Sequence, residues 1–365
     1  MKERIGILTG GGDCPGLNAV IRAVVKTATH CGWDTIGFIG GYEGLLDKEY
    51  IALDYKKMDY ILSVGGTILK TSNKGRFSVK TGVGQIGCLD PAVRDGAVKS
   101  FNELGLKALV CVGGDGSLTI AQQLFEAGIP LVGVPKTIDN DLGGTLLTFG
   151  FDSAVSCAMD AIDRLKTSAE SHNRVMIVEL MGRYAGWITL WAGVSGGADV
   201  ILIPEIPFNY ESVCAHIRKR EKEGKEYTII AVSEGAHAQG DELSLVAGAQ
   251  EKNREARLGG IGNKVAAEVQ KRTGKECRVC VLGHLQRGGG PTSLDRVLCT
   301  ALGATAVGLI QSGKFGYMAS YLPPKFTSVK ITDAIGRLRV VQPDEEMVQI
   351  ARDMGISLGD EVKNQ

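Results

Sequence analysis

The stretch from Pro135 to Asp141, which reads Pro-Lys-Thr-Ile-Asp-Asn-Asp, carries side chains well suited to chemistry. Two carboxylates, Asp139 and Asp141, stand two residues apart, and Lys136 and Thr137 precede them. One carboxylate could accept a proton from an attacking hydroxyl while the other assists a metal or the substrate, and the lysine and threonine could hold phosphate oxygens. Asp-Asn-Asp alone is also typical of a polar turn with an Asx cap. The stretch indicates phosphoryl transfer if the rest of the chain supplies a phosphate site.

Two glycine-rich turns could supply that site. Residues 10–16, Gly-Gly-Gly-Asp-Cys-Pro-Gly, follow an apolar run and precede a helical pattern, so backbone N–H groups and a helix N-terminus could face a phosphate. Residues 113–117, Gly-Gly-Asp-Gly-Ser, have the same setting. There Asp115 is well placed for Mg²⁺ and Ser117 for nucleotide phosphates. A plain tight turn is the alternative interpretation of this second motif.

Apolar runs of strand length alternate with helical patterns along the chain, and polar residues repeatedly follow the strand ends. This pattern predicts an α/β fold of two doubly wound, Rossmann-like lobes with mainly parallel sheets, in which ligands bind beyond the carboxyl ends of the strands. Strands are expected at 4–8, 34–39, 108–112, 129–134, 175–180, 198–203, 227–232 and 278–282. Helices are expected at 17–28, up to 106, up to 127, 153–167, from 187, 210–222 and 262–272, with a further strand and helix after 323.

Composition excludes several classes of protein. The 365 residues are 44% hydrophobic and 22% charged, as in ordinary globular proteins. Lys plus Arg equals Asp plus Glu at 41 each, so no global field favours nucleic acid. No apolar run approaches the roughly twenty residues that span a bilayer. The nine cysteines and the polar N-terminus predict free thiols and a cytoplasmic protein.

Two further motifs are set aside. Residues 82–87 formally satisfy the dinucleotide fingerprint, but no apolar strand precedes them and Pro91 would interrupt the helix that must follow. Cys277 and Cys280 form a C-x-x-C pair inside an expected strand, where two core cysteines are favoured over a metal site.

Five motifs taken together resemble the 6-phosphofructokinase family. They occur in the family's order from the N-terminus to about residue 315, and the last fifty residues match loosely. The motifs are Gly-Gly-Gly-Asp-Cys-Pro-Gly-Leu-Asn-Ala (10–19), Gly-Gly-Asp-Gly-Ser (113–117), Pro-Lys-Thr-Ile-Asp-Asn-Asp (135–141), Met-Gly-Arg-Tyr-Ala-Gly (181–186) and Gly-His-Leu-Gln-Arg-Gly-Gly (283–289).

The resemblance implies five catalytic residues. Asp139 would be the general base on the sugar 1-hydroxyl, with Asp141 beside it and Thr137 near the transferred phosphoryl group. Gly12 would cradle the phosphate donor. Arg183 would bridge the sugar and the phosphoryl group and stabilise the charge that develops between them.

The resemblance also implies a donor site and a sugar site. The donor site would hold Mg²⁺ on Asp115 and would comprise Gly12, Lys74, Arg76, Gly114, Asp115, Gly116, Ser117 and Lys136. A family arginine aligns with Asn73, so which of Lys74 and Arg76 contacts the donor stays open. The sugar site would comprise Thr137, Asp139, Asp141, Arg174, Met181, Gly182, Arg183, Glu234, Arg278, His284 and Arg287.

Fructose 6-phosphate would be gripped at its 6-phosphate by Arg174, Arg278, His284 and Arg287. In the family, Arg174 and Arg278 come from a neighbouring subunit, which implies a homotetramer, or a homodimer, with shared active sites. Residues 1–150 and about 286–335 would form the ATP-binding lobe, and 151–285 with about 336–365 the sugar-binding lobe.

The donor signature is mixed. Pyrophosphate-dependent members carry Asp where Gly116 stands and Lys at the position of Lys136, whereas bacterial ATP-dependent members often carry Gly at the latter. Gly116 leaves room for a nucleotide, so ATP is favoured and pyrophosphate is the alternative. Basic residues of the family's effector site are present at Arg22, Lys26 and Lys166, but Tyr55 replaces an arginine, which leaves allosteric control open.

Two alternatives lie outside this family's chemistry. NAD and lipid kinases share Gly-Gly-Asp-Gly but lack the other motifs. A catalytically silent sugar-phosphate-binding regulatory subunit would have no physical need for both Asp139 and Asp141. The sequence therefore favours a glycolytic 6-phosphofructokinase that uses ATP, Mg²⁺ and fructose 6-phosphate.

Overall fold

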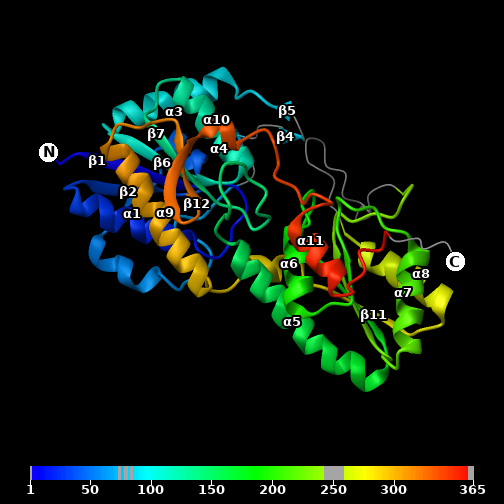
Figure 1. Cartoon of the computed structure of the whole chain (residues 1–365). Coiled ribbons are helices and arrows are strands. Elements are labelled where there is room, and N and C mark those ends of the chain that lie inside the picture. The colour runs from blue at the N-terminus through cyan, green and yellow to red at the C-terminus, as the bar shows by residue number, and fades with distance from the viewer. Residues whose placement is uncertain (1, 73–74, 78–80, 83–84, 242–258, 361–365) are drawn as a thin grey trace. The chain divides into compact units, whose positions relative to one another are not determined.

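The computed structural model describes residues 2–72, 75–77, 81–82, 85–241 and 259–360. The chain forms two compact units. Unit 1 comprises Met1–Ser153 and Arg287–Leu338, and unit 2 comprises Ala154–Gln286 and Arg339–Gln365 (Figure 1).

Unit 1 is built on a seven-stranded sheet. Its inner strands β12, β7, β6, β1 and β2 run parallel, and β3 and β13 pair antiparallel at the two edges. The chain leaves β1 for β2 on one side and later fills the other side with β6, so the strand order reverses at β1. The order is β13 (Lys325–Lys330), β12 (Tyr317–Leu322), β7 (Leu131–Pro135), β6 (Ala108–Gly113), β1 (Arg4–Thr9), β2 (Asp34–Phe38) and β3 (Tyr50–Ala52).

Helices cover this sheet. Among them α1 and α9 pack side by side, as Figure 1 shows, and approach closely at Gly303, where an added Cβ would lie 2.8 Å from the Ala23 side chain. The helices of this unit are α1 (Leu17–His30), α2 (Tyr42–Asp47), η1 (Tyr55–Ile61), α3 (Pro91–Glu103), α4 (Asp115–Glu126), α9 (Ser293–Gln311) and α10 (Ile331–Ala334). The short strands β4 (Thr81–Gly82) and β5 (Gln85–Ile86) pair with each other.

Helix α9 is more apolar than the sequence analysis expected. Among the described residues it alone has the length and hydropathy of a membrane-crossing helix, with a mean hydropathy of 1.4 over the tested window. Half of that window is buried in the structure, and α9 packs on α1, β7 and β12. Core helices of globular proteins share these properties, and the first turn of α9 carries the buried carboxylate of Asp295.

Asp295 ties the start of α9 to the start of α5 (Phe151–His172). Its carboxylate accepts hydrogen bonds from Gly150 N at 3.0 Å, from Ser153 N at 2.9 Å and from Ser153 Oγ at 2.5 Å. In return, Ser153 Oγ accepts from Thr292 N at 3.1 Å, at the N-cap of α9. Burial raises the pKa of Asp295, whereas these donors lower it. Each helix N-terminus is therefore capped by a side chain from the other.

Unit 2 contains a four-stranded parallel sheet in the order β11 (Cys277–Val281), β8 (Val175–Leu180), β10 (Thr228–Ser233) and β9 (Val200–Leu202). Strands β8 and β10 are completely buried, which explains their mainly apolar sequences. The one carboxylate in β8, Glu179, is buried and accepts hydrogen bonds from Gly260 N and Gly262 N. The helices are α5, which begins in unit 1, α6 (Trp187–Gly196), α7 (Tyr210–Lys222), α8 (Ile261–Thr273) and α11 (Glu346–Asp353), with the 3₁₀ turn η2 (Gly283–Arg287) after β11.

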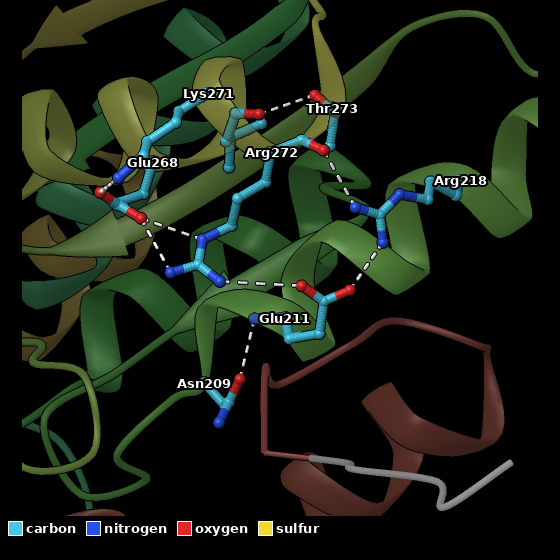
Figure 2. A network of polar contacts seen from close by, with 8 residues as sticks. Asn209, Glu211, Arg218, Glu268, Lys271, Arg272 and Thr273 are labelled. Atoms are coloured by element: carbon cyan, nitrogen blue, oxygen red, sulfur yellow. Dashed lines mark hydrogen bonds and ion pairs between the residues drawn. The ribbon is translucent and has the colours of Figure 1, made fainter.

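The basic face of α7 is largely ion-paired. Glu211 on α7 forms ion pairs with Arg218 of the same helix and with Arg272 of α8 (Figure 2). Arg272 also forms an ion pair with Glu268 of α8. Arg220 is shielded from solvent and pairs with Asp199 at 2.8 Å. The sequence predicts a helix over 210–222, and the structure shows in addition a network of ion pairs that links α7 to α8. Each exposed pair contributes at most about 1 kcal/mol.

The structure corrects several local predictions. Pro91 occupies the first turn of α3, where its missing N–H costs nothing, and does not interrupt a helix. Residues 42–44 belong to α2 and not to a loop. Helix α9 and strand β12 were not predicted. The polar stretch 241–258 lies almost wholly outside the described residues. Which ligand each of the two lobes binds stays a prediction.

The shared caps give the first testable prediction. Replacing Asp295 by Ala leaves buried donors at Gly150 and Ser153 without an acceptor, and we expect a loss of about 3 kcal/mol or more in unfolding free energy. The exposed N-cap of α3, Asp90, is the control, and Asp90→Ala should cost about 1 kcal/mol. Urea denaturation of both variants measures the difference. Equal losses would show that the buried carboxylate has no special role.

Candidate functional site

In unit 1, the loops after β1, β6 and β7 emerge at one edge of the sheet. These three strands are parallel and adjacent, so their carboxyl ends point the same way. The loops begin at Gly10, Gly114 and Lys136, and they carry the three motifs at 10–19, 113–117 and 135–141. The edge includes the point where the strand order reverses, which is the usual ligand position in open α/β sheets.

Lys136 connects the three loops. Its backbone N donates to Gly113 O at 2.9 Å, and its Nζ donates to Gly12 O at 2.5 Å. The side chain is only 4% exposed, and burial lowers the pKa of its ammonium group. A cation in this position is held at the centre of the edge by the glycine loop that follows β1.

Asn140 sets the shape of the acidic loop. It adopts a left-handed conformation, with a φ of 52°, which asparagine tolerates better than most residues. Its buried side chain accepts from Thr148 N at 2.9 Å and donates to Leu146 O at 3.3 Å, while Thr148 Oγ1 donates to Thr137 O at 2.7 Å. These bonds brace the loop against the segment that leads into α5.

The carboxyl groups of Asp139 and Asp141 both have raised pKa values. Burial raises the pKa of Asp139, while Arg287 and Lys136 oppose that shift. Burial together with the charge of Asp139 raises the pKa of Asp141 to about 7. Thr137 lowers the pKa of both carboxyls through its side chain, and its Oγ1 also accepts from Asp139 N at 3.1 Å. Asp141 can therefore gain or lose a proton near neutral pH, beside a second carboxyl whose pKa is also raised.

Arg287 lies against the first glycine loop. Its Nη1 donates to Asp13 O at 3.1 Å, and a Cβ built at Gly12 would lie 3.0 Å from the same nitrogen. The structure thus brings Arg287, Gly12, Lys136 and Asp139 together. Cys14 in this loop is fully buried, and burial raises the pKa of its thiol to about 12, which favours a packing role for it.

The second glycine motif begins helix α4. Asp115 is its first residue, and its carboxylate accepts from Gly336 N at 3.0 Å. Its charge also contributes to the raised pKa of Asp141. Ser117, two residues further on, is buried, and Gly114 lies against the Lys136 carbonyl, which is 3.1 Å from the position of an added Cβ.

Lys74 and Arg76 are the two basic residues that the resemblance offers for the donor site. Lys74 lies outside the described residues. The Arg76 side chain pairs with Glu43 of α2 at 2.7 Å and with Asp47 of the same helix. These carboxylates raise the pKa of the Arg76 guanidinium and hold it against α2.

In unit 2, the loops after β8, β10 and β11 emerge beside one another, because β8 pairs in parallel with both neighbours. They carry Met181, Gly182 and Arg183 after β8, Glu234 after β10, and His284 after β11. The Arg183 guanidinium stacks on the Tyr184 ring, with 5.2 Å between its Cζ and the ring centroid.

Arg174 and Arg278 stand at the opposite ends of β8 and β11, near where these strands begin. Both pair with Glu276, Arg174 through Nε at 2.7 Å and Arg278 through Nη2. The structure therefore groups these two arginines, and it separates them along the strands from Met181, Glu234 and His284.

Sequence reasoning missed several residues that shape the site. Asn140 and Thr148 brace the acidic loop, and Gln286 and Ser233 hold the turn after β8, as described below. An asparagine between two acids was the one local signal for a left-handed residue. The other contacts join distant parts of the chain.

Comparison with known proteins follows from this geometry. The family model described as Phosphofructokinase matches residues 4–310. An ATP-dependent 6-phosphofructokinase from Chloroflexus aurantiacus is 50% identical over 362 residues, which cover 99% of this chain and 99% of that protein. A pyrophosphate–fructose 6-phosphate 1-phosphotransferase from Amycolatopsis mediterranei is 47% identical over 340 residues, covering 93% and 96%.

The crystal structure of a phosphofructokinase from Pichia pastoris is similar in fold. It aligns with a TM-score of 0.80 at 29% identity over 92% of this chain. This chain spans 35% of that longer one. The predicted fold class, α/β with mainly parallel sheets, is confirmed.

The raised pKa of Asp141 predicts a pH-dependent stability. In an unfolded chain this carboxyl titrates near pH 3.9, so between about pH 4 and pH 7 the folded protein binds more protons and loses stability as the pH rises. Asp141→Asn removes the buried charge. We expect this variant, without ligands, to be more stable than the wild type at pH 8, by about 1 to 3 kcal/mol, with the gap narrowing toward pH 4.

Thermal unfolding of both proteins across this pH range measures the gap. Asp139→Asn is the companion variant, because it removes the neighbouring charge and should move the titration of Asp141 to lower pH. An Asp141→Asn variant no more stable than the wild type at pH 8 would contradict a raised pKa.

Proposed function

Since the chain belongs to the phosphofructokinase family, as its motifs indicated, we propose that it transfers the terminal phosphoryl group of Mg·ATP to the 1-hydroxyl of fructose 6-phosphate. The products are fructose 1,6-bisphosphate and ADP, in a glycolytic reaction. The observation that carries this proposal is the acid pair Asp139 and Asp141, which lies at the strand edge beside Lys136 and Arg287.

The acid pair supplies the base. Asp139 takes the proton of the sugar 1-hydroxyl as that oxygen attacks the phosphoryl group. Its raised pKa makes it a stronger base than an ordinary carboxylate, while the charges of Arg287 and Lys136 oppose that shift and favour the ionised form. Asp141 shares the proton with Asp139, and the Thr137 hydroxyl orients both carboxyl groups.

Cations and backbone donors supply the remaining stabilisation. A loose, anionic transition state needs positive groups already in place, more than covalent chemistry. Gly12 and Lys136 would cradle the donor phosphates, and Arg183 would stabilise the transferring phosphoryl group. Met181 and Glu234 would hold the fructose.

The acidic residues fit a magnesium ion that arrives with the nucleotide. Within the part of the chain that the structure describes, no group of three or more His, Cys, Asp or Glu side chains could hold a metal by itself. Mg²⁺ commonly takes one or two carboxylates together with phosphate oxygens, and Asp115 at the start of α4 supplies one. When bound, the ion neutralises charge on the donor phosphates.

Pyrophosphate is the second candidate donor. Lys136 and the relative from Amycolatopsis mediterranei favour it. Gly116 favours ATP, because an Asp there would repel the α-phosphate, and several close relatives carry the ATP-dependent name.

The assembly we propose is a cytoplasmic homotetramer, or a homodimer, with active sites shared between subunits. Arg174 and Arg278 support this, because Glu276 groups them at the far ends of their strands from Met181 and His284. In a shared site they would reach the 6-phosphate bound by the neighbouring subunit, joined by that subunit's own His284 and Arg287. Their forked guanidinium groups match a phosphate monoester.

Removing the base tests the chemistry. Asp139→Ser should lower kcat by about 10²- to 10⁴-fold while fructose 6-phosphate binding, measured by calorimetry, is largely kept. Asp95→Ser on the exposed face of α3 is the control and should match the wild type. Unchanged turnover in Asp139→Ser would remove that residue from the base role.

Substitution at Gly116 tests the donor. With ATP and pyrophosphate offered separately, the wild type should turn over fructose 6-phosphate with ATP. Gly116→Asp should raise the KM for ATP by about tenfold or more, because its carboxylate faces the α-phosphate. Gly116→Ala adds bulk without charge and should have a smaller effect. A wild type that works with pyrophosphate alone would overturn the ATP assignment.

A further inference from the structure

The turn after β8 is held by side chains from both neighbouring strands. This turn, residues 181–183, carries Met181 and Arg183. In the proposed function Met181 binds the sugar and Arg183 stabilises the transferring phosphoryl group. Strand β8 lies between β10 and β11 in the sheet. The segments that follow β10 and β11 therefore flank the turn.

Gln286 holds the turn from the β11 side. Its Oε1 accepts the Met181 backbone N–H at 2.9 Å, and the side chain is fully buried. A backbone N–H can only donate, so this contact fixes which end of the amide carries the oxygen. The Nε2 at the other end is buried, and no hydrogen bond to it occurs among the described residues.

Ser233 holds the turn from the β10 side. Its Oγ donates to Gly182 O at 2.6 Å, and Gly235 N donates to the same carbonyl at 3.1 Å. Gly182 has a φ of 141°, and a Cβ added to it would lie 2.4 Å from Ser233 Oγ. The serine hydroxyl thus occupies the space that a larger residue at 182 would need.

The backbone on either side is equally close. A Cβ built at Gly235 would lie 2.0 Å from the Arg183 carbonyl oxygen, so the strand end after β10 fits directly against the turn. Glu234 N donates to Leu180 O at 2.8 Å, which continues the pairing of the two strands. These contacts reach the turn from both sides, from the end of β10 and from the segment after β11, so the turn has little freedom to shift.

We propose that Gln286 and Ser233 are positioning residues for phosphoryl transfer. They touch neither substrate and act by fixing the backbone from which Met181 and Arg183 project. The inference rests on the proposed function. A displacement of about 1 Å at a reacting group can lower the rate about a hundredfold. Loss of either hydrogen bond should therefore lower the catalytic rate as well as the stability of the fold.

Substitutions at Gln286 test this. Gln286→Met keeps the volume and removes the acceptor of the Met181 N–H, and we expect kcat/KM for fructose 6-phosphate to fall by about 10- to 100-fold, with KM for ATP within about twofold of the wild type. Gln286→Glu keeps an acceptor oxygen and should restore most of the activity. Ser233→Ala removes the hydrogen bond to the Gly182 carbonyl and should lower kcat/KM for fructose 6-phosphate in the same way. The two variants test the proposal independently, so it stays testable if one of them fails to fold.

A matched control separates positioning from stability. Gln123 is a bridging glutamine in unit 1, which accepts from Leu89 N at 2.7 Å and donates to Gly87 O at 2.8 Å. Gln123→Met should lower the melting temperature and leave KM for fructose 6-phosphate unchanged.

The outcomes are distinct. An active wild type with Gln286→Met and Ser233→Ala within twofold of it would overturn the positioning role alone. Equal damage in Gln286→Met and Gln286→Glu would do the same, because the acceptor would then be irrelevant. A wild type that turns over fructose 6-phosphate with neither donor would instead refute the proposed function, and the inference with it.

Discussion

The buried ammonium of Lys136 is the contact on which the edge of unit 1 depends. A charged group shielded from water is costly unless it is paired, and here it is met by the Gly12 carbonyl and faces the charge of Asp139. Because the same residue donates its backbone N–H to Gly113, the loops after three adjacent strands share one anchor. The shape of the glycine loops and the charge of the acid loop are therefore set together.

The two units position their functional residues by different means. In unit 1 two opposing effects set the pKa of Asp139: burial raises it, and the charges of Arg287 and Lys136 lower it. In unit 2 neutral hydrogen bonds with Ser233 and Gln286 fix the backbone from which Met181 and Arg183 project. In the proposed function a proton moves at the first site, whereas the second mainly binds and orients the reacting groups, and the difference fits that division.

Much of the fold could be predicted because its strands are buried on both faces. Strands β1, β6 and β8 therefore appear as mainly apolar runs, and the polar loops after them stand out in the sequence. Helix α9 escaped prediction since it is apolar on most sides and its Asp295 is buried.

The acidic residues of the site could be predicted for the same reason, because they directly follow the end of a strand. The residues that hydrogen-bond to the site's loops could not be predicted. Gln286 lies 105 residues from Met181 along the chain, and Thr148 acts through a backbone carbonyl. Such bonds depend on where the strands come together, and no local pattern of residue types encodes them.

The order in which the chain is synthesised gives the packing of α1 against α9 a further consequence. A nascent chain presents α1 near its beginning, but the helix that covers it, and the strands β12 and β13 that complete its sheet, leave the ribosome only after nearly all of unit 2. For most of translation the apolar flank of α1 around Ala23 therefore lacks its partner. Surfaces left open in this way are the ones that chaperones shield.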